Sequence, residues 1–214
     1  MSKKVLRLSL IMCVVGLIGL TTLVVSIRKT ATASSKSLQN RKITDEAAQR
    51  YHMISALSVE DRKVYFGNAP DAVRSELWQA HFVEYLKNHP ELNSAQRNVI
   101  EDAITFATPE LFQMARNSQG KSEVLNSMEI VLKARAQAVF VKGEAKNIFA
   151  LLGEPIPIQK LTTGAAYPAY CDCNQSHDWC SLGSTSTQCK GWSCWNCGAC
   201  GCGFMWQYSC DGVC

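Results

Sequence analysis

Cysteine is the residue whose number and spacing in this sequence point most directly to chemistry. Ten of the eleven cysteines fall within residues 171–214. The ten positions are Cys171, Cys173, Cys180, Cys189, Cys194, Cys197, Cys200, Cys202, Cys210 and Cys214. Such a density is typical of two kinds of segment. One is held by disulfide bonds because it is too short to build an adequate core, and the other binds a metal through thiolates.

Two Cys-x-x-Cys spacings, Cys194 to Cys197 and Cys197 to Cys200, match those of redox or zinc sites. His177 could complete a zinc site together with three cysteines, although an exposed loop histidine is the more common case. A thioredoxin-type redox site needs a βαβ context, which this stretch of Gly, Ser, Thr and aromatic residues lacks. Whether these cysteines bind a metal or form disulfides therefore depends on the redox conditions of the compartment in which the segment folds.

The N-terminus has the order of features that is typical of a secretory signal peptide. Three basic residues come first, an apolar run covers residues 8–27, and Ala31 and Ala33 provide a small-residue cleavage site before Ser34. This order predicts a signal peptide over residues 1–33.

The same segment also fits a retained membrane anchor. Residues 8–27 are numerous enough to cross a bilayer as a helix, and Arg28 and Lys29 follow directly, as they do after a transmembrane stretch. In either case the rest of the chain leaves the cytoplasm, with the export machinery as its first partner.

Export favours disulfides, because dense cysteines outside the cytoplasm oxidise and stay oxidised. The eleventh cysteine, Cys13, lies inside the apolar run, so ten remain when that run is set aside. We expect these ten to form five disulfides, with no metal and no cofactor. The pairing cannot be predicted from the spacing.

The elements that precede the cysteines are helical. Residues 34–44 are polar and predict a flexible lead-in, whereas residues 45–152 (the helical region) show apolar residues three and four apart. Thr44, Ser94 and Thr108 are expected to cap helices, since each stands just before such a stretch. The prediction is an all-α pro-region of five or six short helices.

A change of composition separates the helical region from the cysteines. Residues 153–168 hold three prolines with glycine and threonine, which predicts an extended linker. Residues 169–214 (the tail) show no helical periodicity and predict a small disulfide-rich, loop-rich module.

Several functional classes are excluded or unsupported. The net charge of +4 comes from five basic residues without an acid in the first 33 positions, so no basic surface for nucleic acid is predicted. No nucleophile elbow, zinc-protease motif or phosphate-binding loop occurs. His52, His81 and His89 are expected on helix surfaces or partly buried. We therefore expect no catalytic residues and no enzymatic activity.

The two ends of the tail resemble a known peptide. The opening reads Cys171-Asp172-Cys173, then six residues that end in Asp178-Trp179, then Cys180. The close reads GCGFMWQY over residues 201–208, followed by Cys210 and Asp211-Gly212. Both resemble the bacteriocin peptide fulvocin C, and the whole chain resembles the bacteriocin fulvocin C-related proteins. The cysteines in the middle are more crowded than in that peptide, which leaves the number and pairing of the bridges open.

The resemblance implies a secreted antibacterial peptide that is made as a precursor, with a processing protease and a target-cell membrane or surface receptor as partners. A short stapled peptide cannot bury many rings, so several are expected to form an exposed contact surface. These residues are Trp192, Trp195, Phe204, Trp206 and Tyr208. The alternative for these rings is that they merely cover the disulfides, since small disulfide-rich folds also use aromatic residues as core. The alternative is a structural or binding module of the cell surface, in which the tail stays attached.

Overall fold

The computed structural model describes six stretches of the chain. They are residues 43–118, 122–141, 143–153, 173–180, 188–191 and 201–213. All of them belong to one compact unit, Ile43–Cys214. The predicted signal or anchor, with residues 8–27, Ala31 and Ala33, lies outside the described residues, as does almost all of the predicted linker. Among the residues described, none of the helices has both the length and the apolar character of a membrane span.

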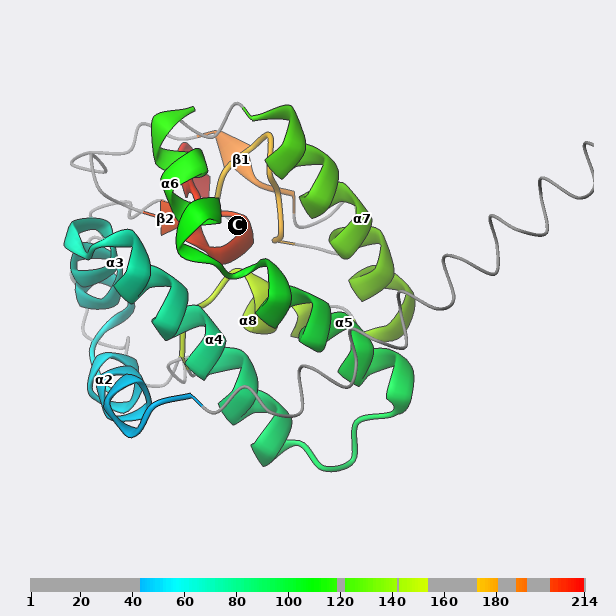
Figure 1. Cartoon of the computed structure of the whole chain (residues 1–214). Helices are drawn as coiled ribbons and strands as arrows, with labels where there is room; N and C mark the ends of the chain where they lie inside the picture. Colours follow the sequence, from blue (N-terminus) through cyan, green and yellow to red (C-terminus); the bar gives the residue numbers. More distant parts are fainter. Residues whose placement is uncertain are drawn as a thin grey trace, which may run out of the picture. The chain divides into compact units, whose positions relative to one another are not determined.

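The described part of the chain is mostly helical, as predicted (Figure 1). The helices are α2 (Asp45–Ser55), α3 (Val59–Asn68), α4 (Asp71–Asn88), α5 (Ser94–Phe106), α6 (Pro109–Asn117), α7 (Glu123–Val139) and α8 (Glu144–Phe149). These seven exceed the five or six expected. The additional helix is α8: the backbone becomes extended at Phe140, directly after α7, and Gly143, with a φ of 87°, stands at the N-cap of α8.

Side chains just before the helices determine where most of them begin. The hydroxyl groups of Thr44 and Thr108 accept hydrogen bonds from backbone N–H groups of the first turn, which confirms both predicted caps. The prediction for α5 is wrong by one residue. Asn93, rather than Ser94, caps this helix, because Asn93 and Gln96 exchange side chain-to-backbone hydrogen bonds in a capping box.

Helix α4 lies at the centre of the helical region. It packs against α2, α5 and α6, as Figure 1 shows for the helices coloured from blue-green to green. Leu77, Trp78 and Phe82 on α4 are completely buried, and they form the middle of the core. The core of the helical region is therefore organised around this helix.

The tail contains short strands that the sequence did not predict. Strand β1 (Lys190–Gly191) pairs antiparallel with β4 (Gly212–Val213), and β2 (Gly201–Cys202) pairs antiparallel with β3 (Tyr208–Ser209). A 3₁₀ turn, η3 (Phe204–Trp206), connects β2 to β3. Each strand has only two residues, too short for an alternating apolar pattern to be visible.

The tail and the helical region differ in composition but share one compact unit. In Figure 1 the red C-terminal residues lie among the helices, and strand β2 contacts α3. The contacts that join the two regions form the candidate functional site.

Candidate functional site

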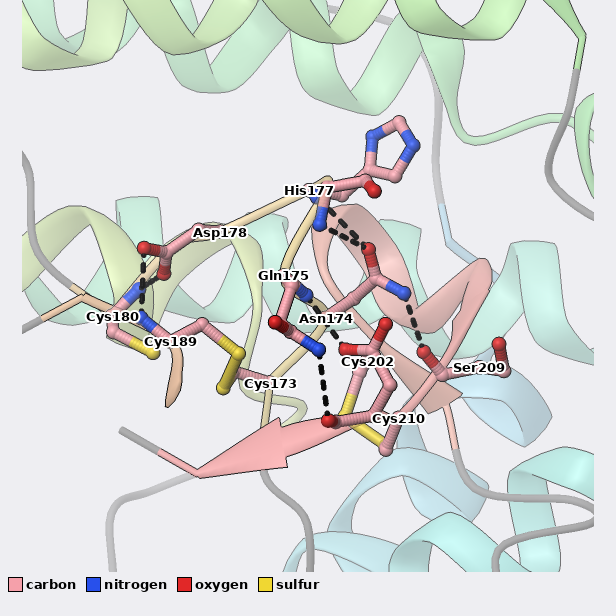
Figure 2. Close-up of a disulfide and its surroundings, with 12 residues drawn as sticks. Cys173, Asn174, Gln175, His177, Asp178, Cys180, Cys189, Cys202, Ser209 and Cys210 are labelled. Atoms are coloured by element: carbon pink, nitrogen blue, oxygen red, sulfur yellow. Dashed lines mark hydrogen bonds between the residues drawn. A yellow bond between two sulfur atoms is a disulfide. The ribbon is translucent and has the colours of Figure 1, made fainter. Parts of the chain in front are cut away.

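Two disulfides stabilise the described part of the tail (Figure 2). One joins Cys173 to Cys189 and the other joins Cys202 to Cys210. Cys180 is disulfide-bonded as well. The second bond connects β2 to the residue after β3, so it closes the turn that carries η3. The prediction of a disulfide-bonded tail is confirmed for these cysteines, while Cys171, Cys194, Cys197, Cys200 and Cys214 lie outside the described residues.

Three sulfur atoms come close enough together to be considered as metal ligands. The Sγ atoms of Cys173, Cys180 and Cys189 all lie within 4.8 Å of one another. Zinc binds cysteine as the deprotonated thiolate. In this structure the disulfide between Cys173 and Cys189 occupies two of these sulfurs, so the group cannot bind a metal in its oxidised form.

Polar side chains fix the backbone of residues 174–180 (Figure 2). The Asn174 carboxamide accepts hydrogen bonds from the N–H groups of Ser176 and His177, and it donates one to the carbonyl of Ser209. The Asp178 carboxylate accepts the N–H of both Cys180 and Cys189. These bonds hold the side chains of His177 and Trp179 in one direction, toward helix α7.

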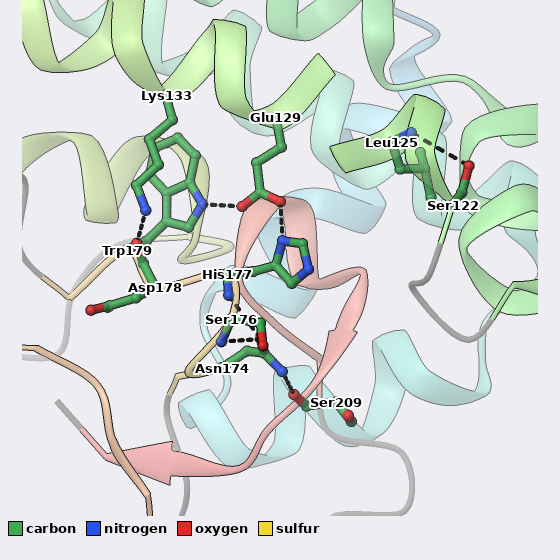
Figure 3. A network of polar contacts seen from close by, with 10 residues as sticks. All are labelled: Ser122, Leu125, Glu129, Lys133, Asn174, Ser176, His177, Asp178, Trp179 and Ser209. Atoms are coloured by element: carbon green, nitrogen blue, oxygen red, sulfur yellow. Dashed lines mark hydrogen bonds and ion pairs between the residues drawn. The ribbon is translucent and has the colours of Figure 1, made fainter. Parts of the chain in front are cut away.

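The carboxylate of Glu129 on α7 receives these two side chains (Figure 3). Its Oε1 accepts a hydrogen bond of 2.7 Å from the Trp179 indole, and its Oε2 lies 2.5 Å from Nδ1 of His177. Glu129 is only 2% exposed and Trp179 is buried. We call these interactions the Glu129 contact. The expectation that His177 is an exposed loop residue is wrong, because its side chain is only 15% exposed and lies against a buried carboxylate of another region.

Two further interactions surround the Glu129 contact. The ring of His177 stacks on Tyr208 at a centroid distance of 3.5 Å. Burial, together with the charge of Glu129, raises the pKa of Tyr208, so this phenol stays neutral. On the other side, Lys133 donates to the carbonyl of Asp178 and lies over the Trp179 ring, 5.6 Å from its centroid.

Trp206 makes the main apolar contact between the tail and the helices. Its ring meets Phe66 of α3 and Trp78 of α4 edge to face, with centroid distances of 5.5 and 6.0 Å. Its indole N–H donates to the carbonyl of Ala150 at 2.9 Å. Trp206 is 4% exposed. We call this set the Trp206 contact, and it satisfies both the apolar and the polar part of the side chain.

In the full chain, three of the predicted contact residues, Phe204, Trp206 and Tyr208, are buried. Trp192 and Trp195 lie outside the described residues. The covering rings come from both regions: Trp206 packs against Phe66 and Trp78, Phe204 against Trp179, and Tyr208 against His177. The contact surface was predicted for the released tail, and for that state it stays a prediction.

A buried lysine of the helical region faces a disulfide of the tail. Nζ of Lys63 on α3 lies 3.5 Å from Sγ of Cys202 and 3.7 Å from Sγ of Cys210. The same ammonium group lies 5.9 Å from the centroid of the Trp206 ring. A cation so placed is attracted by the face of the ring and by the weakly accepting sulfur atoms.

His81 was expected at a helix surface or partly buried, and it is instead fully buried in α4. Its Nε2 donates to the carbonyl of Ile148, while Nδ1 accepts from the Tyr51 hydroxyl and the Gly153 N–H. Burial lowers its pKa to about 4, so the ring is neutral at pH 7. These bonds join α4 to α2, to the last turn of α8 and to Gly153 beyond it, and we assign His81 a structural role.

Sequence signals for this site were weak. Glu129 occupies a position of the apolar stripe of α7, between Leu125 and Leu132, both of which are buried. An acidic residue at a core position indicates a buried polar contact, but the partner cannot be identified from spacing alone. Comparison with protein-family models, with curated proteins and with solved structures gave no match.

Proposed function

We propose that the chain is the exported precursor of a disulfide-stabilised antibacterial peptide, a bacteriocin of the fulvocin C type, which resides in the tail. The resemblance of both ends of the tail to that peptide and the export signal of the sequence motivate this proposal. In this function the chain has no catalytic role, and its partners are the export machinery, a processing protease and a receptor or membrane of the target cell.

The observation that carries the proposal is that no disulfide can link the tail to the helical region. Both described disulfides join cysteines within the tail. The sequence has no cysteine between Cys13 and Cys171, so no disulfide can tie the tail to the helical region. One cut in the connecting segment therefore yields a separate peptide with its cross-links intact, as a precursor requires.

The second candidate function is a module of the cell surface whose tail is never cut. The burial of Trp179, Phe204 and Trp206 favours it, because these rings complete the core of the helical region. In this case the disulfides protect the fold outside the cytoplasm, and the whole unit binds or presents something at the surface.

Intact mass spectrometry of the exported product tests the two functions against each other. A precursor gives a fragment that begins near residue 169 and gains one pair of hydrogens per disulfide on reduction. That fragment, purified from the culture medium, should inhibit growth of relatives of the producing bacterium, and the reduced fragment should not. A surface module gives only the uncut chain in the cell-envelope fraction. An oxidised fragment without any inhibitory effect would contradict the antibacterial function.

A further inference from the structure

We infer that the helical region is a binding partner of the tail and holds it without a covalent bond, so that cutting the connecting segment does not release the tail. The inference rests on the proposed function, in which such a cut occurs. It adds a second step after the cut: the tail becomes free, and its rings become exposed, only when the contacts with the helices are broken.

The Trp206 contact supplies the apolar part of this binding. Tryptophan is among the residues that contribute most to protein interfaces when its ring is buried and its N–H is paired. Trp206 meets both conditions, with Phe66 and Trp78 against its ring and the Ala150 carbonyl as acceptor. Release of the tail would expose all three rings to water, which opposes dissociation.

The Glu129 contact supplies the polar part and fixes the orientation of the tail. Release of the tail would break the hydrogen bond that Glu129 accepts from the Trp179 indole and the contact of the same carboxylate with Nδ1 of His177, two interactions of an acidic group made in a buried site. Lys133 adds a hydrogen bond to the backbone between those two residues. The helical region thus binds specific side chains of the tail and does not merely cover an apolar surface.

Lys63 forms a third point of attachment on the disulfide-bonded turn of the tail. Its ammonium group lies against the sulfurs of Cys202 and Cys210 on the turn that also carries Trp206. The position of Lys63 therefore suits the turn in its oxidised form, in which both sulfur atoms lie next to the ammonium group. Residues of α3, α4 and α7 all take part, so the binding surface exists only when these helices are assembled.

The consequence of this binding concerns the ring residues of the tail. While the tail is bound, Trp179, Phe204, Trp206 and Tyr208 are buried and cannot contact a membrane or a receptor. The bound tail is therefore inactive even after the cut, and a cell that keeps the helical region intact is protected from its own peptide.

The experiment uses the full chain with a protease recognition sequence inserted between residues 158 and 166. The oxidised protein is purified, cut, and passed over a size-exclusion column, and native mass spectrometry identifies what elutes. We expect the two fragments to elute together at the position of the uncut protein. Separation of the fragments in native buffer, to the same extent as in strong denaturant, would overturn the inference.

A matched pair of variants tests whether the Glu129 contact carries the binding. Glu129→Gln removes the buried charge, whereas Glu123→Gln removes an exposed one at the start of the same helix. In the cut protein, Glu129→Gln should raise the fraction of free tail at least tenfold, and Glu123→Gln should leave it unchanged. Circular dichroism of the uncut variants, in which the tail is tethered, shows whether each has folded. Equal free fractions in two folded variants would contradict the role of Glu129.

Growth inhibition, measured separately, distinguishes the inference from the proposed function. The cut complex should not inhibit bacteria, and the tail, separated in denaturant without reductant and then diluted, should inhibit them. If the fragments stay together but the freed tail has no effect, the antibacterial function fails and the binding stands. If the fragments separate at once and the tail inhibits, the binding is wrong and the antibacterial function stands.

Discussion

The helical region and the tail are stabilised in different ways. In the helical region, caps next to most helices and an apolar face along them determine most of the local structure, as for the capping box of Asn93 and Gln96. The tail has strands of two residues, and its shape depends on disulfides and on side chains that reach across it. The two tryptophans of the tail that the structure describes, Trp179 and Trp206, pack against rings of the helical region.

This difference shows that a change of amino-acid composition along the chain need not mark the edge of a separately packed domain. The sequence changes character between residues 153 and 168, yet Trp206 from beyond this boundary contacts Phe66 and Trp78 in the helical core. A disulfide-rich segment of this size lacks the volume to bury its own aromatic residues. When a helical region precedes it in the same chain, the missing core can come from there.

Removing the shared ring should have the largest effect. Trp206→Ala leaves a cavity beside Phe66 and Trp78 and removes the bond to Ala150, so we expect it to lower the free energy of unfolding by about 3–5 kcal/mol. Urea unfolding followed by circular dichroism of the helices measures this loss. Tyr65→Ala, which truncates a partly exposed ring on α3, is the control and should cost about 1 kcal/mol or less. Equal losses would mean that the two regions do not share a core.

Removing a disulfide bond should lower mainly the stability of the tail. Replacing both Cys173 and Cys189 with Ala opens a cross-link with a sequence separation of 16, and we expect a loss of about 3 kcal/mol. The double replacement of Cys202 and Cys210, with a separation of 8, should cost about 2.5 kcal/mol. Hydrogen exchange should accelerate for Asn174 to His177 and stay slow in α4. Faster exchange in α4 would show that the disulfides also stabilise the helices.

Acid should weaken the connection that His81 makes within the helical region. Burial lowers the pKa of His81 from 6.5 to about 4 in the folded protein, so the unfolded chain takes up this proton first as the pH falls. The contribution of neutral His81 to the free energy of unfolding is fully present above pH 6.5. It decreases as the pH falls from 6.5 to 4, by about 3 kcal/mol at most.

Unfolding measured at a series of pH values, with two variants, tests this dependence. His81→Gln should remove most of the slope between pH 6.5 and pH 4. His52→Gln changes an exposed histidine on α2 and should keep the slope. An unchanged slope in His81→Gln would assign the acid sensitivity to other groups.

The smallest effect is expected at a helix end, where structure is local. Asn93→Ala removes the side chain that caps α5 and should cost about 1 kcal/mol. Ser94→Ala, at the residue that the sequence favoured as the cap, should cost about 0.3 kcal/mol or less. Thermal unfolding of both variants measures the difference, and a larger loss for Ser94→Ala would return the cap to the position predicted from the sequence.

Much of the helical region could be predicted, because its signals are close together in the chain. For example, Pro70 before α4 and His89-Pro90 after it account for the bounds of this helix, Asp71–Asn88. A glycine such as Gly143 indicates an interruption, but whether a new helix follows it depends on packing. Errors in this region are therefore small shifts and one additional helix.

The candidate site could not be predicted to the same degree, because its parts are far apart in the sequence. Nothing near His177 indicates that a carboxylate from α7 will reach it, and nothing near Glu129 indicates an indole. The rings of the tail were recognised as too many for its size. The sequence cannot tell whether water, a membrane or another part of the chain will cover them.

The contact between Lys63 and Cys202 joins two parts of the chain that the ribosome makes at different times. These residues are 139 positions apart in the chain. At a synthesis rate of roughly 5–20 residues per second, about 7–28 s pass between the appearance of α3 and that of the turn that carries Trp206. During this interval Phe66 and Trp78 have been made and their partner has not. The aromatic core around Trp78 therefore stays incomplete until Trp206 has been made.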